Sequence, residues 1–133
     1  MNNQGLRFSA LWLGLGWLVI AVIFYFSLSH HSLEPHTHLP IDKVEHFSAY
    51  VGLMWWFSQL YTRTSQRVWL AIALVGMGIL VEILQGMTGY RDMSAGDAVA
   101  DTLGILVGWW LVGTRFGNVL SRLDQKLVTR RAS

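Results

Sequence analysis

Four long apolar segments alternate with short polar ones along the chain. The apolar segments cover residues 8–28, 44–61, 68–84 and 98–114. Their lengths fall within, or at the edge of, the ~17–25 residues of a membrane-spanning helix. The first segment has no charged residue, and each of the others carries charge only near one end. The pattern predicts an all-α protein, a four-transmembrane-helix bundle that forms one domain over residues 1–133.

The two ends of the chain can each be interpreted separately. The first apolar segment is longer than the ~7–15 residues of a signal-peptide core and lacks a small-x-small cleavage site, so we expect an uncleaved anchor. Residues 115–133 continue the helical period with basic residues interspersed, which predicts an amphipathic C-terminal helix. Its recurring apolar residues are Phe116, Val119, Leu120, Leu123 and Leu127.

Basic residues are distributed unequally between the two ends of the predicted bundle. One side holds eight of the ten lysines and arginines: Arg7, Arg63, Arg67, Arg115, Arg122, Lys126, Arg130 and Arg131. The other side holds only Lys43 and Arg91. Because basic loops stay in the cytoplasm, this asymmetry places both termini on the cytoplasmic side of the inner membrane.

Composition agrees with a membrane protein. Hydrophobic residues make up 53% of the chain and charged residues 14%, against ~25% charged in soluble domains. The net charge of +2 is too small to indicate a nucleic-acid partner. The expected partner is therefore the lipid bilayer, with a membrane protein or a second copy of the chain as further candidates.

Most acidic residues fall at the outer ends of the predicted spans. Residues three or four apart share a helix face, and this groups the polar residues of three spans. The groups are His46 with Tyr50, Glu82 with Gln85 and Gly78, and Asp97 with Asp101. The sequence predicts that they converge on one polar pocket at the outer membrane surface.

A structural interpretation of these residues stays open. Asp42, Ser94 or Asp97 could cap a helix. Glu82 lies near a helix C-terminus, where the dipole disfavours an anion. Asp101 lies about one turn inside its span, where charge is costly. Pairing with Arg91, Lys43 or His46 would be the structural explanation for both, and Arg91 is the expected partner of Glu82 or Asp97.

Small residues recur every four positions on the fourth span: Gly96, Ala100, Gly104 and Gly108. Such a ladder lets another helix approach closely, so we expect it to dock against a neighbour. The histidine-rich segment 30–38 contains enough ligands for zinc, but it has no firm ligand spacing and is more typical of a solvated loop.

The ordered polar residues resemble the VanZ-like family of small integral membrane proteins. The stretch DKVEHFSAY, from Asp42 to Tyr50, is similar to the family's D-K-x-x-H-F-x-x-Y. Glu82 and Gln85 match its E-x-x-Q, and Arg91, Ser94 and Asp97 match its R-x-x-S-x-x-D. Asp101 departs from the family's asparagine. The family is named for a protein that confers low-level teicoplanin resistance, so the resemblance implies membrane placement and a role in glycopeptide susceptibility, but no reaction.

Two principal functions follow. The first is a site that binds or acts on an envelope lipid or a lipid-linked cell-wall component. Glu82 or Asp97 would act as general base and His46 as acid or base, or the carboxylates would hold a divalent metal. The remaining binding candidates are Asp42, Lys43, Tyr50, Gln85, Arg91, Ser94 and Asp101. The second is a non-catalytic accessory or scaffold protein held together by ion pairs; a small transporter is a third possibility.

Overall fold

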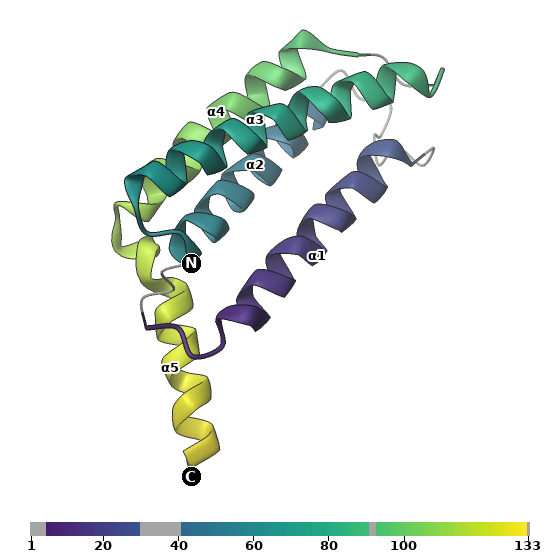
Figure 1. Cartoon of the computed structure of the whole chain (residues 1–133). Helices are drawn as coiled ribbons and strands as arrows, with labels where there is room; N and C mark the ends of the chain where they lie inside the picture. Colours follow the sequence, from purple (N-terminus) through teal and green to yellow (C-terminus); the bar gives the residue numbers. More distant parts are fainter. Residues whose placement is uncertain (1–4, 30–40, 91–92, 133) are drawn as a thin grey trace.

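The structure is a computed structural model that describes residues 5–29, 41–90 and 93–132. Within these residues every regular element is a helix (Figure 1). The elements follow in the order α1 (Ser9–Leu28), α2 (Ile41–Leu60), α3 (Thr64–Met87), α4 (Ala95–Val112), a short 3-10 helix η1 (Arg115–Asn118) and α5 (Val119–Ala132). The predicted helices, including the C-terminal one, are all present.

Three of these helices, α1, α3 and α4, are long and apolar enough to cross a membrane. The predicted fourth span corresponds to α2, which is as long as α1 but is not among them. The reason lies in its first turns, where Asp42, Lys43, Glu45 and His46 lower its mean hydropathy. The third helix is longer than predicted, at 24 residues, since it continues in both directions beyond segment 68–84.

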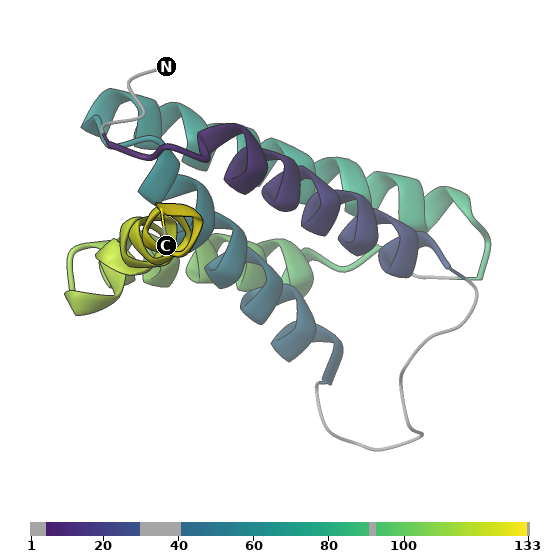
Figure 2. The same cartoon turned by 90° about the horizontal axis from the view of Figure 1, so that it is seen from below.

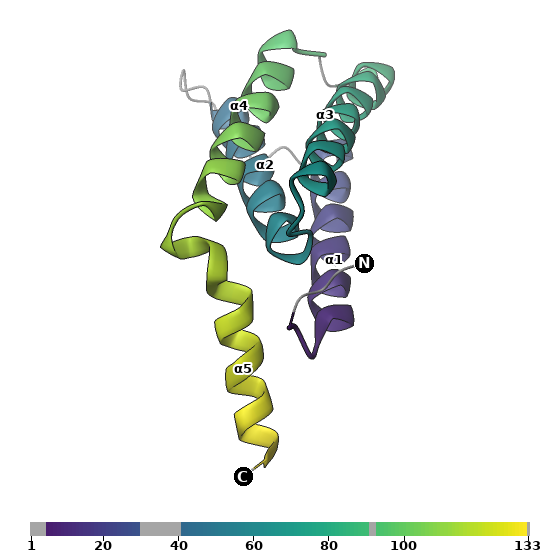
Figure 3. The same cartoon turned by 60° about the vertical axis from the view of Figure 1, so that its left-hand side comes forward.

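Helix α2 forms the centre of the bundle, with α4 on one side and α1 and α3 on the other (Figure 3). Its buried apolar side chains include Tyr50, Leu53, Met54 and Phe57. A central helix is covered by neighbours on several sides, so it can carry polar residues that a lipid-facing helix cannot. The position of α2 therefore accounts for its composition.

Helix α4 packs against α2 through its small residues, as the sequence predicts. A Cβ atom added to Gly108 would lie 2.6 Å from the carbonyl oxygen of Val51, and one on Gly104 would collide with the carbonyl oxygen of Phe47. The two backbones approach this closely only because glycine has no side chain. This contact sets the relative position of the two helices that carry most of the polar residues.

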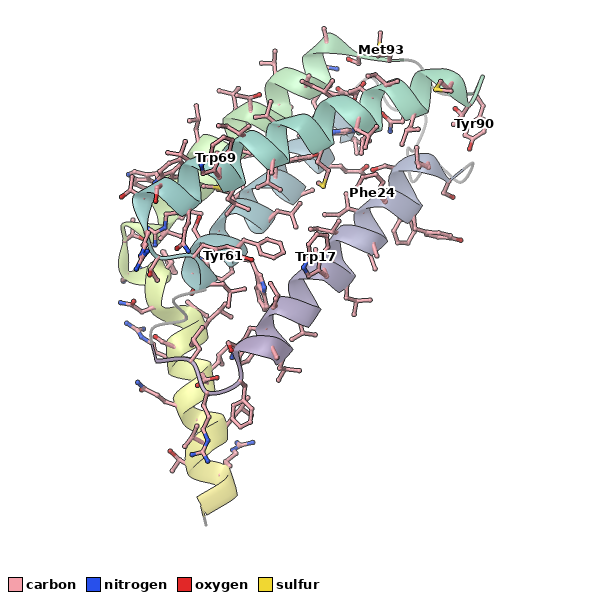
Figure 4. All side chains as sticks on the ribbon, viewed as in Figure 1. Trp17, Phe24, Tyr61, Trp69, Tyr90 and Met93 are labelled. Carbon is pink, nitrogen blue, oxygen red and sulfur yellow. The ribbon has the colours of Figure 1, made fainter. Side chains whose placement is uncertain are left out.

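Helix α1 is the least enclosed of the four long helices, with only Trp12 and Gly16 buried. Its middle contacts α2 through aromatic rings: Trp17 packs edge-on against Phe57, which stacks on Tyr61 (Figure 4). Near its C-terminus, the Tyr90 hydroxyl donates a hydrogen bond of 2.6 Å to the carbonyl oxygen of Leu28. Most other side chains of α1 are exposed apolar groups, as expected of a helix in lipid.

Helix α5 leaves the bundle at the end where α1 begins (Figures 1 and 2). Its buried Asp124 accepts hydrogen bonds from the backbone N–H groups of Arg7 (2.7 Å) and Phe8 (2.9 Å) and from the indole N–H of Trp12 (2.8 Å). Burial raises the pKa of this carboxyl, but the hydrogen bonds from Trp12, Phe8 and Arg7 outweigh it and hold the pKa below its usual range. Asp124 thus fixes the residues that lead into α1, up to its N-cap residue Phe8, against the far end of the chain.

Candidate functional site

A group of polar residues, most of them buried, belongs to helix ends that lie at the end of the bundle opposite α5. It is built from the start of α2, the end of α3 and the start of α4, which come together in the upper part of Figure 1. The group, called the polar site below, consists of Asp42, Lys43, His46, Tyr50, Glu82, Asp97 and Asp101. The predicted convergence of these three helix ends is therefore present in the structure.

His46 occupies the middle of the polar site. Its Nδ1 lies 2.9 Å from Oδ1 of Asp101, and both side chains are buried. Its Nε2 faces two further carboxylates, at 3.9 Å from Oδ1 of Asp42 and 3.9 Å from Oε1 of Glu82. An ionised carboxylate only accepts hydrogen bonds, so the proton of a neutral His46 belongs on Nδ1. The lone pair on Nε2 then points toward Asp42 and Glu82.

Glu82 connects the end of α3 to the start of α4. Its Oε2 accepts a hydrogen bond of 2.7 Å from the backbone N–H of Ser94, which is the N-cap residue of α4. This contact places a carboxylate at a helix N-terminus, which the helix dipole favours. Glu82 is thereby held by one oxygen, and its other oxygen is directed at His46.

Asp97 pairs with Lys43, whose Nζ lies 3.2 Å from Oδ1 of Asp97. Asp97 is buried, whereas the Lys43 side chain is 49% exposed, so the lysine reaches into the site from its rim. The interpretation of Asp97 as a helix cap is wrong, because Ser94 occupies that position and Asp97 lies inside α4. Asp42 likewise lies inside α2 rather than before it.

The floor of the polar site is formed by Tyr50 and Gly78. A Cβ atom on Gly78 would lie 2.5 Å from Oδ2 of Asp101 and 3.3 Å from the Tyr50 hydroxyl oxygen. The absent side chain at Gly78 therefore makes the room in which the Asp101 carboxylate sits against α3. The helical spacing from Gly78 to Glu82 is the sequence signal for this arrangement.

Two further residues of the predicted set have different positions. The side-chain amide of Gln85 donates a hydrogen bond of 2.9 Å to the carbonyl oxygen of Ser27, so it joins α3 to α1. Arg91 lies outside the described residues, as does the histidine-rich segment 30–38. The partner of Asp97 that the structure describes is Lys43.

Sequence reasoning missed the contacts at the opposite end of the bundle. It did not predict that Trp12 donates to Asp124, or that Trp56 donates to the carbonyl oxygen of Trp12. The available signal was Asp124 itself, the single acidic residue on the side that holds eight basic ones. A lone carboxylate there needs donors, and indole N–H groups are donors.

Three buried oxygen atoms of the polar site have no hydrogen-bond partner within the described part of the chain. They are Oε1 of Glu82, Oδ2 of Asp101 and the hydroxyl oxygen of Tyr50. The site thus combines acid–base groups with unused hydrogen-bonding capacity.

Comparison with known proteins gives no match to a family model, to a curated protein or to a solved structure.

Proposed function

We propose that the chain is a VanZ-like integral membrane protein whose polar site binds, and acts on, the polar head of an envelope lipid or lipid-linked cell-wall component. His46 is the acid–base group of this proposal, and Glu82 is the carboxylate beside it that faces the substrate. Lys43 at the rim suits an anionic head group, since it is half exposed and already engages a carboxylate. Glycopeptide susceptibility is the phenotype that the family resemblance implies.

The unpartnered oxygen atoms of Glu82, Asp101 and Tyr50 carry this proposal. Each buried polar atom without a partner costs about 1–3 kcal/mol. A polar network kept only for stability satisfies its members. Three buried oxygen atoms that the described residues leave without a hydrogen bond, two of them on carboxylates that contact His46, instead favour a site whose ligand or substrate completes the hydrogen bonding.

A structural ion-pair network is the second candidate. The pair of Lys43 with Asp97 and the contact of His46 with Asp101 favour it, because each links α2 to α4. Oε1 of Glu82 lies within ion-pair distance of Nε2 of His46, at 3.9 Å, but it accepts no hydrogen bond from the described residues, which an ion-pair network alone does not explain. We therefore rank the structural network below the working site.

The proposal places the polar site at the outer face of the inner membrane, with α2 as a fourth spanning helix and both termini in the cytoplasm. The eight-to-two distribution of basic residues supports this orientation. The central position of α2 supports its assignment as a fourth spanning helix, because a helix shielded by neighbours tolerates polar residues within the membrane.

Reporter fusions test this orientation. We expect a reporter fused after Ser133 to be active only in its cytoplasmic form, and one inserted within residues 33–39 only in its periplasmic form. The insertion tests whether the segment after α1 is outside, and together with the C-terminal fusion it tests whether α2, α3 and α4 cross an odd number of times. A periplasmic signal from the C-terminal fusion would contradict the four-span arrangement.

Charge-removing substitutions in the polar site separate the two functions. We expect Glu82→Gln and Asp97→Asn to abolish the effect of the protein on teicoplanin susceptibility, while membrane abundance and melting temperature stay close to wild type. If the residues only form structural pairs, the same changes should instead lower the melting temperature, more for Glu82→Gln, which faces the buried His46, than for Asp97→Asn, whose partner Lys43 is 49% exposed.

The matched control is Glu45→Gln, which removes an exposed carboxylate adjacent to His46 in the sequence. We expect it to change neither susceptibility nor stability. Wild-type phenotype and wild-type stability in both Glu82→Gln and Asp97→Asn would exclude a working site and a structural network alike.

A further inference from the structure

The orientation of His46 is typical of a metal ligand. Its Nδ1 is engaged by the buried carboxylate of Asp101 at 2.9 Å, which leaves Nε2 as the available nitrogen. Histidines that bind metals commonly use one ring nitrogen for the ion and donate from the other to a carboxylate, which holds the ring in place. Asp101 would be the orienting carboxylate.

Carboxylate oxygens surround the available nitrogen at distances that suit shared ligation. Oδ1 of Asp42 and Oε1 of Glu82 each lie 3.9 Å from Nε2, which is too long for a hydrogen bond. One donor atom from each of Asp42, His46 and Asp97 lies within 4.8 Å of the other two. Ligands bound ~2.1 Å from a tetrahedral zinc lie about 3.4 Å apart, so these three donor atoms are near ligation distance, and Glu82 joins them through its approach to Nε2.

An independent observation points to a ligand at this position. Oε1 of Glu82 is buried and has no hydrogen-bond partner in residues 5–29, 41–90 and 93–132, and it is directed at Nε2 of His46. The other oxygen of the same carboxylate is occupied by the N–H of Ser94. Glu82 is thus held in place by one oxygen, while the other is available for a cation.

The local charge favours a divalent cation. The polar site gathers the carboxylates of Asp42, Glu82, Asp97 and Asp101, and Lys43 balances one of them through its pair with Asp97. Glu82, Asp97 and Asp101 are buried, and carboxylates brought together away from water need a compensating charge. One imidazole nitrogen together with carboxylate oxygens is a ligand set that suits Zn²⁺, whereas Mg²⁺ and Ca²⁺ favour oxygen ligands alone.

We propose that the polar site binds a divalent ion of the zinc class through Nε2 of His46 and carboxylate oxygens of Asp42, Glu82 and Asp97, with Asp101 orienting the histidine. This inference names the ligand of the site in the proposed function and rests on that site being a working one. The ion would supply a positive centre for an anionic head group, in addition to Lys43.

Metal binding by the purified full-length protein in detergent tests the proposal. The reference protein has His30, His31, His36 and His38 each replaced by glutamine, so that segment 30–38 cannot contribute zinc ligands. After treatment with a chelator, we expect this protein to take up a single Zn²⁺ per chain in calorimetric titration and its melting temperature to rise. Mg²⁺ and Ca²⁺ should not compete at equal concentration.

Substitutions in the reference protein assign the ligands. We expect His46→Gln and Glu82→Gln to abolish the calorimetric signal, and Asp101→Asn to weaken zinc binding by about tenfold through the orientation of His46. Glu45→Gln is the matched control and should bind as the reference does. The melting temperature without metal checks that each variant is folded, and Co²⁺ absorption spectra give a second measure of ligation for any variant that is less stable.

The outcomes separate the metal site from the proposed function. Failure of the reference protein to take up Zn²⁺, or uptake unchanged in both His46→Gln and Glu82→Gln, would overturn the metal site. If zinc binding fails while Glu82→Gln still abolishes the susceptibility phenotype, the proposed function stands without a metal. If zinc binds as expected while Glu82→Gln leaves that phenotype intact, the metal site stands and the proposed function fails.

Discussion

Replacing Gly104 with leucine is expected to destabilise the protein by about 3 kcal/mol or more. This is the upper end of the cost of overpacking, which applies where the contact cannot relax. The reason is that even a Cβ atom at this position would collide with the Phe47 carbonyl oxygen and would lie 3.1 Å from the Cβ of Tyr50. Backbone atoms cannot move aside as a flexible side chain can, so α2 and α4 would have to separate. Thermal unfolding in detergent measures the effect.

The same substitution should also impair the polar site. His46 on α2 and Asp101 on α4 lie 2.9 Å apart across the contact that Gly104 permits. Separation of the helices would break this contact, so we expect the susceptibility phenotype to be lost together with stability. Gly104→Ala should show the same effects in weaker form.

Gly76→Ala is the matched control for the alanine variant. Gly76 also lies inside a helix, α3, but a Cβ atom there would meet nothing within 4 Å. Because alanine has the higher helix propensity, this change should leave the melting temperature unchanged or raise it slightly. Equal melting temperatures for Gly104→Ala and Gly76→Ala would show that the contact between α2 and α4 is wrong.

Asp124→Asn is expected to cost about 3 kcal/mol, because hydrogen bonds to a charged acceptor contribute about 1.5–3 kcal/mol each. The carboxylate accepts three such bonds, from Arg7, Phe8 and Trp12. An asparagine amide group keeps one acceptor oxygen and turns a donor toward the remaining N–H groups. The start of α1 would then detach from α5, which unfolding measurements and proteolysis near the N-terminus can detect.

The pH dependence of this effect has a definite sign. The pKa of Asp124 is lower in the folded protein than its ordinary value, so its contribution to stability is fully present above the unfolded pKa of about 3.9. That contribution is lost as the pH falls through the folded pKa. The difference in stability between wild type and Asp124→Asn should therefore be constant near neutral pH and shrink in acid.

Two further variants check the assignment of this effect to Asp124. Trp12→Phe keeps an aromatic ring but removes a single donor, so it should cost less than Asp124→Asn does. Glu45→Gln, at an exposed carboxylate, should cost nothing. A difference between wild type and Asp124→Asn that is absent at neutral pH would contradict the contact between α5 and α1.

Local sequence patterns determined the helices and the end of the bundle at which the polar residues gather. Apolar runs of membrane-spanning length predict helices without knowledge of their neighbours. Helical spacing assigns Glu82 to the face of Gly78, and Asp101 to the face of Asp97. The glycines of α4 likewise predict a close helix contact, because the absence of a side chain is a local property.

Only the tertiary structure decided which residues pair. The carboxylates of Asp97 and Asp101 are equivalent in the sequence, yet one meets Lys43 and the other meets His46. Their partners depend on how α4 is rotated and shifted against α2, which arises from packing between the two helices. The contact of Asp124 with the residues that lead into α1 depends in the same way on the path of α5 back to Arg7 and Phe8. Backbone N–H groups are alike in every residue, so no sequence pattern marks which of them a distant carboxylate will reach.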